Sequence, residues 1–338
     1  MAALAELIAL HIERWDTSSV EQGVFHTSEP EVVAHELEAF AETSLGSSVR
    51  EALFYASSAG CVAGVVLDDG QRVVMKAYQA QWGRPFLSAV RRVQEELNHA
   101  QFPCARPIFG PDRAGPALAT VEELVADPGM RTLSNGEMAP SAHGLARQVS
   151  LCRGLSDAAL RDQHPLSSAT GELYPQPHNP VFDFSQRTAD AIWIDELAQA
   201  AQVARRIDGF RLTVVHTDWS ARNVRIKDGA LTVAYDWDSV AEVTESVAVG
   251  QAAATWRSTG EVSDPIAPSP DEVQAYLSAY GDGADNHFSV EQRQAAMAAA
   301  LWVLAYTARC EHALEACTGK RVERARARLA DDGWAFLS

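Results

Sequence analysis

Residues 212–240 read LTVVHTDWSARNVRIKDGALTVAYDWDSV, and this stretch decides the fold of the 338-residue chain. The apolar run 212–215 is typical of a short buried strand. Polar residues begin directly after it, so we expect the strand to deliver His216 and Asp218 to a loop. Asn223 ends this loop. The sequence therefore predicts a carboxylate at a strand end, with an amide side chain close behind it.

The second half of the same stretch predicts a β-hairpin. Two apolar runs, 224–226 and 231–235, flank the turn 227–229, which reads KDG. Such turn residues between apolar runs are a hairpin signal. The second strand ends at Asp236. The hairpin therefore returns a second carboxylate to the cleft that contains the loop.

These side chains suit phosphoryl transfer. In that reaction the protein forms no covalent bond; it orients the attacking hydroxyl and holds magnesium on the phosphates. Asp218 would be the base, and Asn223 and Asp236 would hold Mg²⁺, which prefers oxygen ligands. The alternative is that His-x-Asp-x4-Asn arises by chance in a turn-rich loop. The surrounding strands and the sequence Asp236-Trp237-Asp238 favour the site.

This pattern resembles the aminoglycoside phosphotransferase and choline kinase superfamily, whose signature is His-x-Asp-x4-Asn followed by an apolar strand and Asp-Trp or Asp-Phe. The matching residues are His216, Asp218, Asn223, Asp236 and Trp237. The resemblance implies an α+β, protein-kinase-like fold with a small antiparallel-sheet lobe and a larger, mainly helical lobe. It also implies ATP and Mg²⁺ as cofactors and a small-molecule hydroxyl as acceptor, with His216 supporting the catalytic loop.

Two positions depart from the family pattern. Thr217 stands where the family most often has glycine, and Arg222 fills another common glycine position directly before Asn223. We therefore expect a loop of somewhat different shape.

An upstream hairpin supplies a candidate phosphate-binding lysine. Residues 61–67 and 71–78 predict two strands joined by the turn 68–70, and Lys76 lies in the second strand. Only three of the 28 basic residues are lysines, so a lysine in mid-strand suggests a specific role. Its compact ammonium suits the phosphates of ATP. The alternative is a solvated lysine on the outer face of the sheet.

The segment before this hairpin is the candidate loop over the phosphates. Residues 55–64 read YASSAGCVAG, and Ser57 and Ser58 would donate hydrogen bonds there together with backbone amides. The segment lacks a Gly-x-Gly-x-x-Gly pattern. An ordinary hairpin is an equally good interpretation.

A helix beginning at Pro85 is the expected source of a glutamate that pairs with Lys76. Glu95 and Glu96 are the candidates, and Glu96 is preferred because it lies nearer the apolar stripe. Both could instead lie on a solvated face.

The apolar run 117–125 resembles the strand and hinge between kinase lobes, which places Glu122 at the nucleotide site. We expect residues 1–124 to form the nucleotide-binding N-lobe, with a helical extension over residues 1–45. Residues 125–338 would form the C-lobe, with the catalytic loop and the acceptor site. The chain is long enough for two such lobes.

The C-lobe is expected to bind the acceptor. Its predicted helices are 141–155, 187–207, 271–280 and 290–316, and the Pro-broken segment 173–184 either lines the acceptor pocket or is an irregular connection. Four carboxylates are candidate ligands of an acceptor amine: Asp238, which has the best claim, and Asp183, Glu242 and Glu245. A strand-like backbone would place Asp236 and Asp238 on one face.

Composition narrows the function classes. A formal net charge of −17 argues against nucleic-acid binding, which needs clustered Lys or Arg. The charge permits a cationic acceptor but equally suits simple solubility. No apolar run is long enough for a membrane span, and the five cysteines show no metal-binding spacing, so a cytoplasmic protein with reduced thiols is expected. A noncatalytic, pseudokinase-like nucleotide-binding protein is the alternative function.

Overall fold

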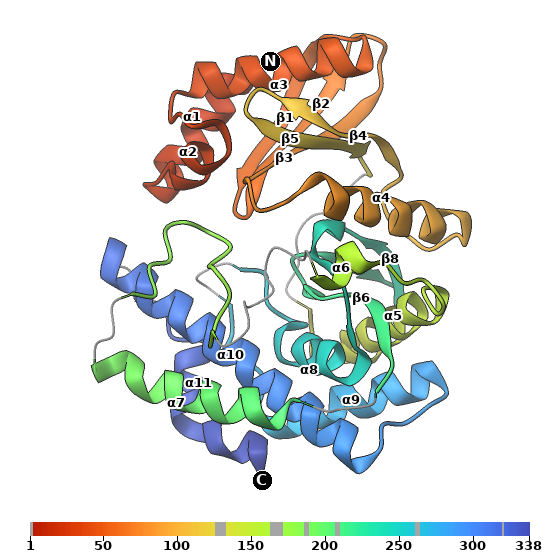
Figure 1. Ribbon diagram of the computed structural model, residues 1–338, viewed down its shortest axis with the longest axis vertical. Helices are drawn as coiled ribbons and strands as arrows, with labels where there is room; N and C mark the ends of the chain where they lie inside the picture. Colours follow the sequence, from red (N-terminus) through yellow and green to blue (C-terminus); the bar gives the residue numbers. More distant parts are fainter. Residues whose placement is uncertain are drawn as a thin grey trace.

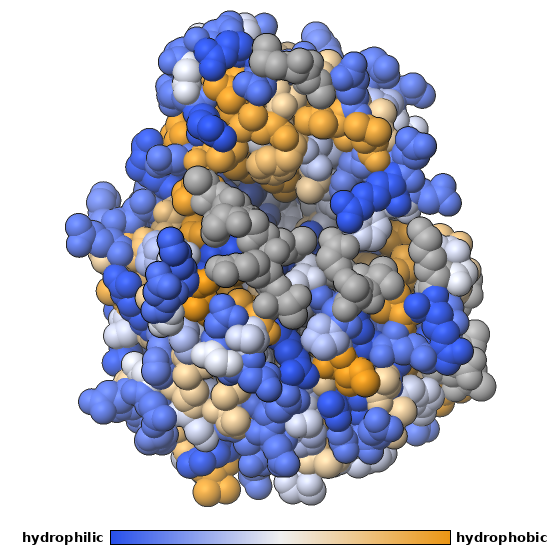
Figure 2. All heavy atoms as spheres, turned by 180° about the vertical axis from the view of Figure 1, so that it is seen from behind, coloured by the Kyte–Doolittle hydropathy of each residue, from blue (hydrophilic) through white to orange (hydrophobic). Residues whose placement is uncertain are grey.

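The computed structural model describes residues 3–125, 133–162, 172–185, 189–206, 210–260, 264–319 and 321–338. The chain forms two lobes, a sheet-containing N-lobe at the top of Figure 1 and a larger, mainly helical C-lobe below it. This confirms the predicted α+β two-lobe fold. Seen from behind, the surface is largely hydrophilic, with apolar side chains gathered on the N-lobe (Figure 2).

A five-stranded antiparallel sheet forms the centre of the N-lobe, in the strand order β1-β2-β3-β5-β4. Its strands are β1 (Val49–Ser57), β2 (Gly60–Leu67), β3 (Arg72–Tyr78), β4 (Pro107–Ala114) and β5 (Ala117–Glu123). The predicted hairpin is β2–β3, and Gly70 in its turn has a φ of 87°, which glycine adopts without strain. Lys76 lies in β3 as predicted.

The two faces of this sheet have different partners. Alternate residues of β3, Val73, Met75 and Ala77, are fully buried in a core beneath the N-terminal helices. Because side chains alternate along a strand, Lys76 and Tyr78 point to the other face. That face packs against α4 (Arg84–His99) and looks towards the C-lobe.

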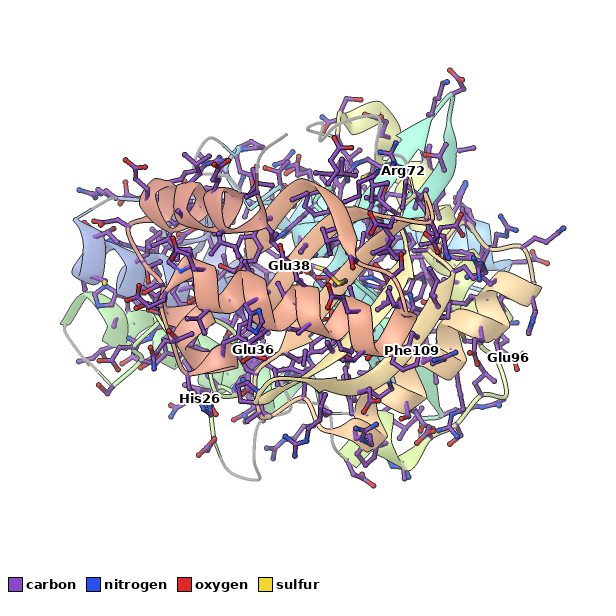
Figure 3. All side chains as sticks on the ribbon, turned by 90° about the horizontal axis from the view of Figure 1, so that it is seen from above. His26, Glu36, Glu38, Arg72, Glu96 and Phe109 are labelled. Carbon is purple, nitrogen blue, oxygen red and sulfur yellow. The ribbon has the colours of Figure 1, made fainter. Side chains whose placement is uncertain are left out.

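Helices cover the outer face of the sheet. The predicted extension contains α1 (Leu4–Trp15) and α3 (Pro30–Leu45), and a short α2 (Ser19–Phe25) that we did not predict. Helix α3 runs across the sheet in Figures 1 and 3 and buries Leu37 and Phe40 against it. The extension is therefore part of the hydrophobic core of the N-lobe.

The C-lobe is mainly helical, with small strand pairs beside its helices. Its helices are α5 (Met138–Leu151), α6 (Ala158–Asp162), α7 (Ala189–Ala204), α8 (Glu245–Thr255), α9 (Pro270–Ala284), α10 (Val290–Thr318) and α11 (Ala325–Asp332). At Gly250 of α8, a Cβ would lie 2.0 Å from the carbonyl oxygen of Ala296 in α10. This glycine therefore permits the close packing of the two helices.

Two antiparallel strand pairs form the frame of the site. Strand β6 (Leu212–His216) pairs with β9 (Val240–Thr244), and β7 (Val224–Lys227) pairs with β8 (Ala230–Ala234). Strand β6 and the β7–β8 hairpin match the prediction. The segment 173–184 contains no helix or strand, which agrees with an irregular connection.

The structure differs from the sequence analysis at the first hairpin. Strand β1 extends to Ser57 and β2 begins at Gly60, so the expected loop 55–64 is mostly strand and turns over only two residues. No helix in the described part of the chain is long and apolar enough to cross a membrane.

The N-terminal extension is expected to stabilise the N-lobe. Leu37→Ala removes a fully buried side chain from the α3–sheet core and should lower the free energy of unfolding by about 2–5 kcal/mol. His35→Ala, on the exposed side of α3, should change it by less than about 0.5 kcal/mol. Urea denaturation checks both values. A Leu37→Ala effect as small as the control's would show that the extension packs loosely.

Candidate active site

A cavity of about 330 Å³ lies between the lobes, a volume within the usual range for a small-molecule site. Residues of β1, β2 and β3 line it from the N-lobe, and residues of the loops after β6 and β8 line it from the C-lobe. Six of the predicted site residues face this cavity: Ser57, Ser58, Lys76, Asp218, Asp236 and Asp238.

The loop after β6 holds Asp218 in a fixed orientation. Asn223 Nδ2 donates hydrogen bonds to Asp218 Oδ2 at 2.8 Å and to the Asp218 carbonyl oxygen at 3.0 Å. These bonds leave Asp218 Oδ1 and the amide oxygen of Asn223 for other partners. The predicted base and one predicted metal ligand are thus brought together.

His216 packs behind this loop. It is fully buried, between Trp219 and Trp237 in edge-to-face contacts. Its Nε2 lies 2.7 Å from the carbonyl oxygen of Tyr235, to which it donates, and its Nδ1 lies 3.1 Å from Ser239 Oγ. Burial lowers the pKa of His216. This imidazole therefore links the loop after β6 to the segment that carries Asp236, without lining the cavity.

The backbone turns sharply at Asp236. This residue has φ 64° and ψ 50°, in the left-handed region, and a single 3₁₀ turn, Trp237–Ser239, follows it. Trp237 is buried and donates from Nε1 to the Ala234 carbonyl oxygen. The expected strand-like backbone is therefore wrong here, yet the Asp236 and Asp238 carboxyl groups still meet, because they are hydrogen-bonded to each other.

Lys76 joins the two lobes. Its Nζ lies 3.3 Å from Glu122 Oε1 and 3.4 Å from Asp236 Oδ1. Burial acts to lower the pKa of Lys76, but Glu122, Asp236 and Asp238 outweigh it and raise the pKa well above its usual value. Burial acts to raise the pKa of Asp236, and Lys76 and Arg222 reverse this, so that its pKa is lowered. The lysine is cationic and the aspartate anionic at neutral pH.

The fold of this chain is similar to those of solved kinase structures. The structure of amicoumacin kinase hAmiN in complex with AMP-PNP, Ca²⁺ and Ami matches with a TM-score of 0.58 and 14% identity over 85% of this chain and 87% of that one. A thermostable mutant of aminoglycoside phosphotransferase APH(4)-Ia matches with a TM-score of 0.51 and 12% identity over 84% and 100%. The chain has the fold of these kinases. No family model and no curated protein matches the sequence.

Within this kinase fold, the carboxylate beside Lys76 comes from an unexpected element. Glu96 is exposed on the outer side of α4, as Figure 3 shows, and Glu95 forms a surface ion pair with Arg91. The prediction that Glu96 pairs with Lys76 is therefore wrong.

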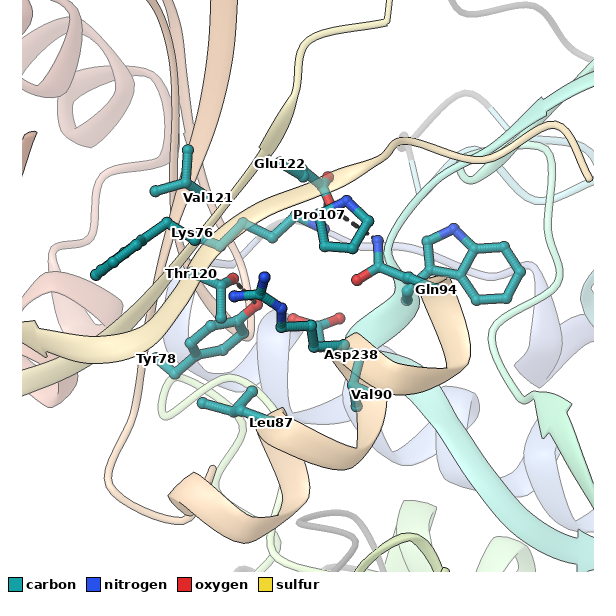
Figure 4. Close-up of a pocket in the computed structure, with 13 residues that line it drawn as sticks. Lys76, Tyr78, Leu87, Val90, Gln94, Pro107, Thr120, Val121, Glu122 and Asp238 are labelled. Carbon is teal, nitrogen blue, oxygen red and sulfur yellow. Dashed lines mark hydrogen bonds and ion pairs between the residues drawn. The ribbon is translucent and has the colours of Figure 1, made fainter. Parts of the chain in front are cut away.

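Glu122 on β5 takes that place. Gln94 on the inner face of α4 donates from Nε2 to Glu122 Oε2 at 3.1 Å, so helix α4 contributes an amide in place of a carboxylate (Figure 4). Thr120 and Glu122 of β5 lie on the same face of the sheet as Lys76 and Tyr78 of β3. Glu122 thus belongs to the site through its side chain, whereas the sequence analysis placed it there as part of a hinge.

The first hairpin contributes Ser57 and Ser58 to the cavity wall. His11 of α1 reaches Ser57, with its Nε2 3.1 Å from both the backbone nitrogen and Oγ. The backbone N–H of Ser57 donates to His11 Nε2, so this ring nitrogen carries no proton. The N-terminal extension therefore braces the turn over the cavity.

The carboxylates predicted to contact an acceptor amine are mostly placed elsewhere. Asp183 is exposed outside the cavity wall. Glu242 is buried and accepts from Ser156 Oγ and the Asp157 backbone, so it is structural. Glu245 accepts from Tyr280 at 2.8 Å.

Of these candidates, only Asp238 lines the cavity. Burial and the charge of Asp236 raise the pKa of Asp238 well above its usual value.

Several cavity residues were missed by the sequence analysis as site residues. They come from the C-lobe: His178, Arg222, Thr255, Ser258, Tyr306 and Thr307. Arg222 carried a signal, because it replaces a common glycine of the loop pattern. His178 lies in the segment 173–184, for which the sequence analysis left two interpretations open: a lining of the acceptor pocket or an irregular connection. Thr255, Ser258, Tyr306 and Thr307 follow no local pattern.

The partly buried imidazole of His178 predicts a pH effect on stability. Burial, with Arg222 acting in the same direction, lowers the pKa of His178 from 6.5 to about 4. The unfolded chain therefore binds a proton more readily, so the free energy of unfolding should fall as the pH drops from 6.5 towards 4. We expect a smaller slope over this window in His178→Gln, measured by urea denaturation. His99→Gln, at an exposed position, should keep the wild-type slope; equal slopes in all three proteins would contradict the assignment.

Proposed function

We propose that this protein is an ATP-dependent kinase that transfers the γ-phosphoryl group to a hydroxyl of a small molecule. The observation that carries the proposal is that Asp218, Asp236 and Lys76 line one inter-lobe cavity, with Asn223 hydrogen-bonded to Asp218 directly behind it. These are the groups that phosphoryl transfer requires, and they come from segments far apart in the sequence.

Each residue has a role that follows from its contacts. Lys76, held by Glu122 and Asp236, would bind the α- and β-phosphates of ATP. Asp218, oriented by Asn223, would accept a hydrogen bond from the acceptor hydroxyl and take its proton. The acceptor oxygen then bonds to the γ-phosphorus, the bond from that phosphorus to the bridging oxygen breaks, and ADP leaves.

The residues present fit a magnesium ion. Asp236 directs a 39% exposed carboxylate side chain to the cavity, and the amide oxygen of Asn223 is not used by its bonds to Asp218. Hard oxygen ligands of this kind suit Mg²⁺. When bound, the ion would neutralise charge on the phosphates.

The proposed acceptor class is a small molecule with a free hydroxyl. The cavity volume suits such a ligand, and two proteins of similar fold are named as kinases of small molecules, one of them in complex with Ami. Their identities of 14% and 12% support the fold and leave the acceptor of this chain open.

A noncatalytic nucleotide-binding protein is the second candidate. The amide of Gln94, where a helix glutamate was expected, favours it. Glu122 provides a carboxylate 3.3 Å from Lys76, however, and Asp218 and Asp236 line the cavity, with Asn223 bonded to Asp218. The catalytic proposal therefore has the stronger support.

The decisive test uses acceptor-dependent ADP release from MgATP. Asp218→Asn should lower turnover by roughly 10²–10⁴-fold, because it removes the base, with little change in MgATP affinity. Asp236→Asn should weaken metal-dependent nucleotide binding itself. Asp183→Asn, outside the cavity, is the matched control and should behave as the wild type. MgATP binding without ADP release for any acceptor would support the noncatalytic alternative.

The Glu122–Lys76 contact predicts a further effect on nucleotide binding. Glu122→Gln keeps the shape of the side chain but removes one of the two charges within 4 Å of Lys76. We expect a roughly 5- to 30-fold weaker affinity for MgATP, which corresponds to a charge-assisted contact of about 1–2 kcal/mol. Isothermal titration calorimetry measures it. Glu123→Gln, which alters an exposed pair with Arg106, should bind normally, and a similar loss in both variants would exclude a specific role for Glu122.

A further inference from the structure

The C-lobe wall of the cavity carries one cationic side chain that the phosphoryl-transfer roles do not use. Apart from Lys76, Arg222 is the one lysine or arginine lining the cavity within the described ranges. It is exposed, and its guanidinium has no ion-pair partner among the described residues. Its positive charge acts on both Asp236 and His178. Arg222 therefore lies near enough to both groups for its charge to reach them.

Asp264, the carboxylate next to this wall, already has hydrogen-bond and ion-pair partners within the protein. Asp264 accepts from Ser258 Oγ, from the backbone of Thr259 and Gly260, and from the Thr259 hydroxyl. It also forms an ion pair with Arg324 at 2.9 Å, and its side chain is only 4% exposed. Asp264 thus fixes the loop 258–260 beside Arg222 without offering a negative charge to a ligand.

The hydroxyl groups of this wall present oxygen lone pairs to the cavity. Thr255 Oγ1 donates to the Gln251 carbonyl, and Thr307 Oγ1 donates to the Val303 carbonyl. Ser258 Oγ donates in the same way to Asp264. Each hydroxyl hydrogen is therefore engaged within the protein. What remains for a ligand is three oxygens that accept hydrogen bonds from ligand hydroxyls.

His178 adds a neutral donor to the same wall. Its backbone N–H donates to Tyr306 Oη at 3.2 Å, and Tyr306 Oη lies 2.9 Å from His178 Nδ1. With the Tyr306 hydroxyl donating to Nδ1, the proton of the neutral imidazole is on Nε2. The part of the wall formed by Arg222, His178, Thr255, Ser258 and Thr307 therefore combines one positive charge, one N–H donor and several accepting oxygens. The carboxylates of the cavity, Asp218, Asp236 and Asp238, are those with proposed roles in phosphoryl transfer or beside Lys76.

We propose that the acceptor is a polyhydroxylated small molecule with one anionic group, either a carboxylate or a phosphate ester, and that Arg222 binds this group. The proposal rests on the kinase function proposed above and names the acceptor class of that site. The ligand hydroxyls contact Thr255, Ser258 and Thr307, and the reacting hydroxyl lies at Asp218. An ammonium-rich acceptor would face the unpaired guanidinium of Arg222, and the carboxylates left to meet it would be those that hold Lys76 and the metal.

A matched series of sugars tests the proposal. ADP release from MgATP is measured with D-glucose, D-glucosamine, D-glucuronate and D-glucose 6-phosphate, and with the corresponding galactose series. We expect kcat/KM for an anionic member to exceed that of its neutral and amino counterparts roughly 10- to 100-fold, as a charge-assisted contact implies. Glucuronate and the sugar phosphate distinguish the two sources of the anionic group.

The variants Arg222→Gln and Arg222→Glu assign the preference to this residue. Arg222→Gln should remove the ratio between anionic and neutral acceptors through the acceptor KM, and Arg222→Glu should shift the preference towards glucosamine. Three outcomes would overturn the proposal: a wild-type preference for the amino sugar, a ratio that survives Arg222→Gln, or a fall in kcat that is equal for all acceptors. The last result would mean that Arg222 contacts the transferred phosphoryl group instead.

A binding measurement keeps this test independent of turnover. With MgAMP-PNP present, the rise in melting temperature caused by each sugar is compared between the wild type and Arg222→Gln. A larger rise with the anionic sugars that disappears in the variant supports the proposal, and no difference between anionic and neutral sugars overturns it. Failure of the kinase function would appear separately, as MgATP binding without Asp218-dependent ADP release.

Discussion

Lys76 carries a positive charge in a place where burial makes an unpaired charge costly. The rest of the site depends on how this charge is compensated. Glu122 compensates it from β5, at 3.3 Å, and Asp236 does so from the C-lobe, at 3.4 Å. A group with partners on two lobes cannot keep both contacts if the lobes move apart. The ion pair thus sets the distance between the N-lobe sheet and the segment that carries the proposed metal ligand.

The net charge of the protein does not describe the part of the cavity around Arg222. The net charge of −17 belongs to the protein as a whole. On that basis alone, a cationic acceptor was possible. Beside Thr255, Ser258 and Thr307, however, the nearby charge is that of Arg222, because Asp264 is taken up by the loop 258–260 and by Arg324. At contact distance, specificity follows the nearby unpaired charge rather than the net charge, which mainly affects solubility and long-range attraction.

The sequence predicted the elements whose signals are local and missed the contacts that strand pairing creates. Strand β6, the β7–β8 hairpin and the lysine strand each carry their own period and turn residues. The partner of Lys76 depends on the register of β3 against β5, in which Val74 is opposite Glu122, and no local pattern encodes that register. Strand β1 was missed because most of its residues are only partly buried, so its sequence lacks a clear alternation.

Thr217 and Arg222, the two residues that depart from the loop pattern, each make contacts that a glycine could not make. At Thr217, both the backbone N–H and the hydroxyl donate to the Ser239 carbonyl oxygen, at 3.2 and 2.5 Å. A glycine could make only the first of these bonds, so the threonine adds a second tie between the catalytic loop and the turn after Asp236. At Arg222, the backbone N–H is held by the Ser258 carbonyl at 3.0 Å, and the side chain extends into the cavity. Thr217 therefore adds a tie that holds the loop after β6, and Arg222 places a positive charge in the same cavity as Asp218 and Asp236.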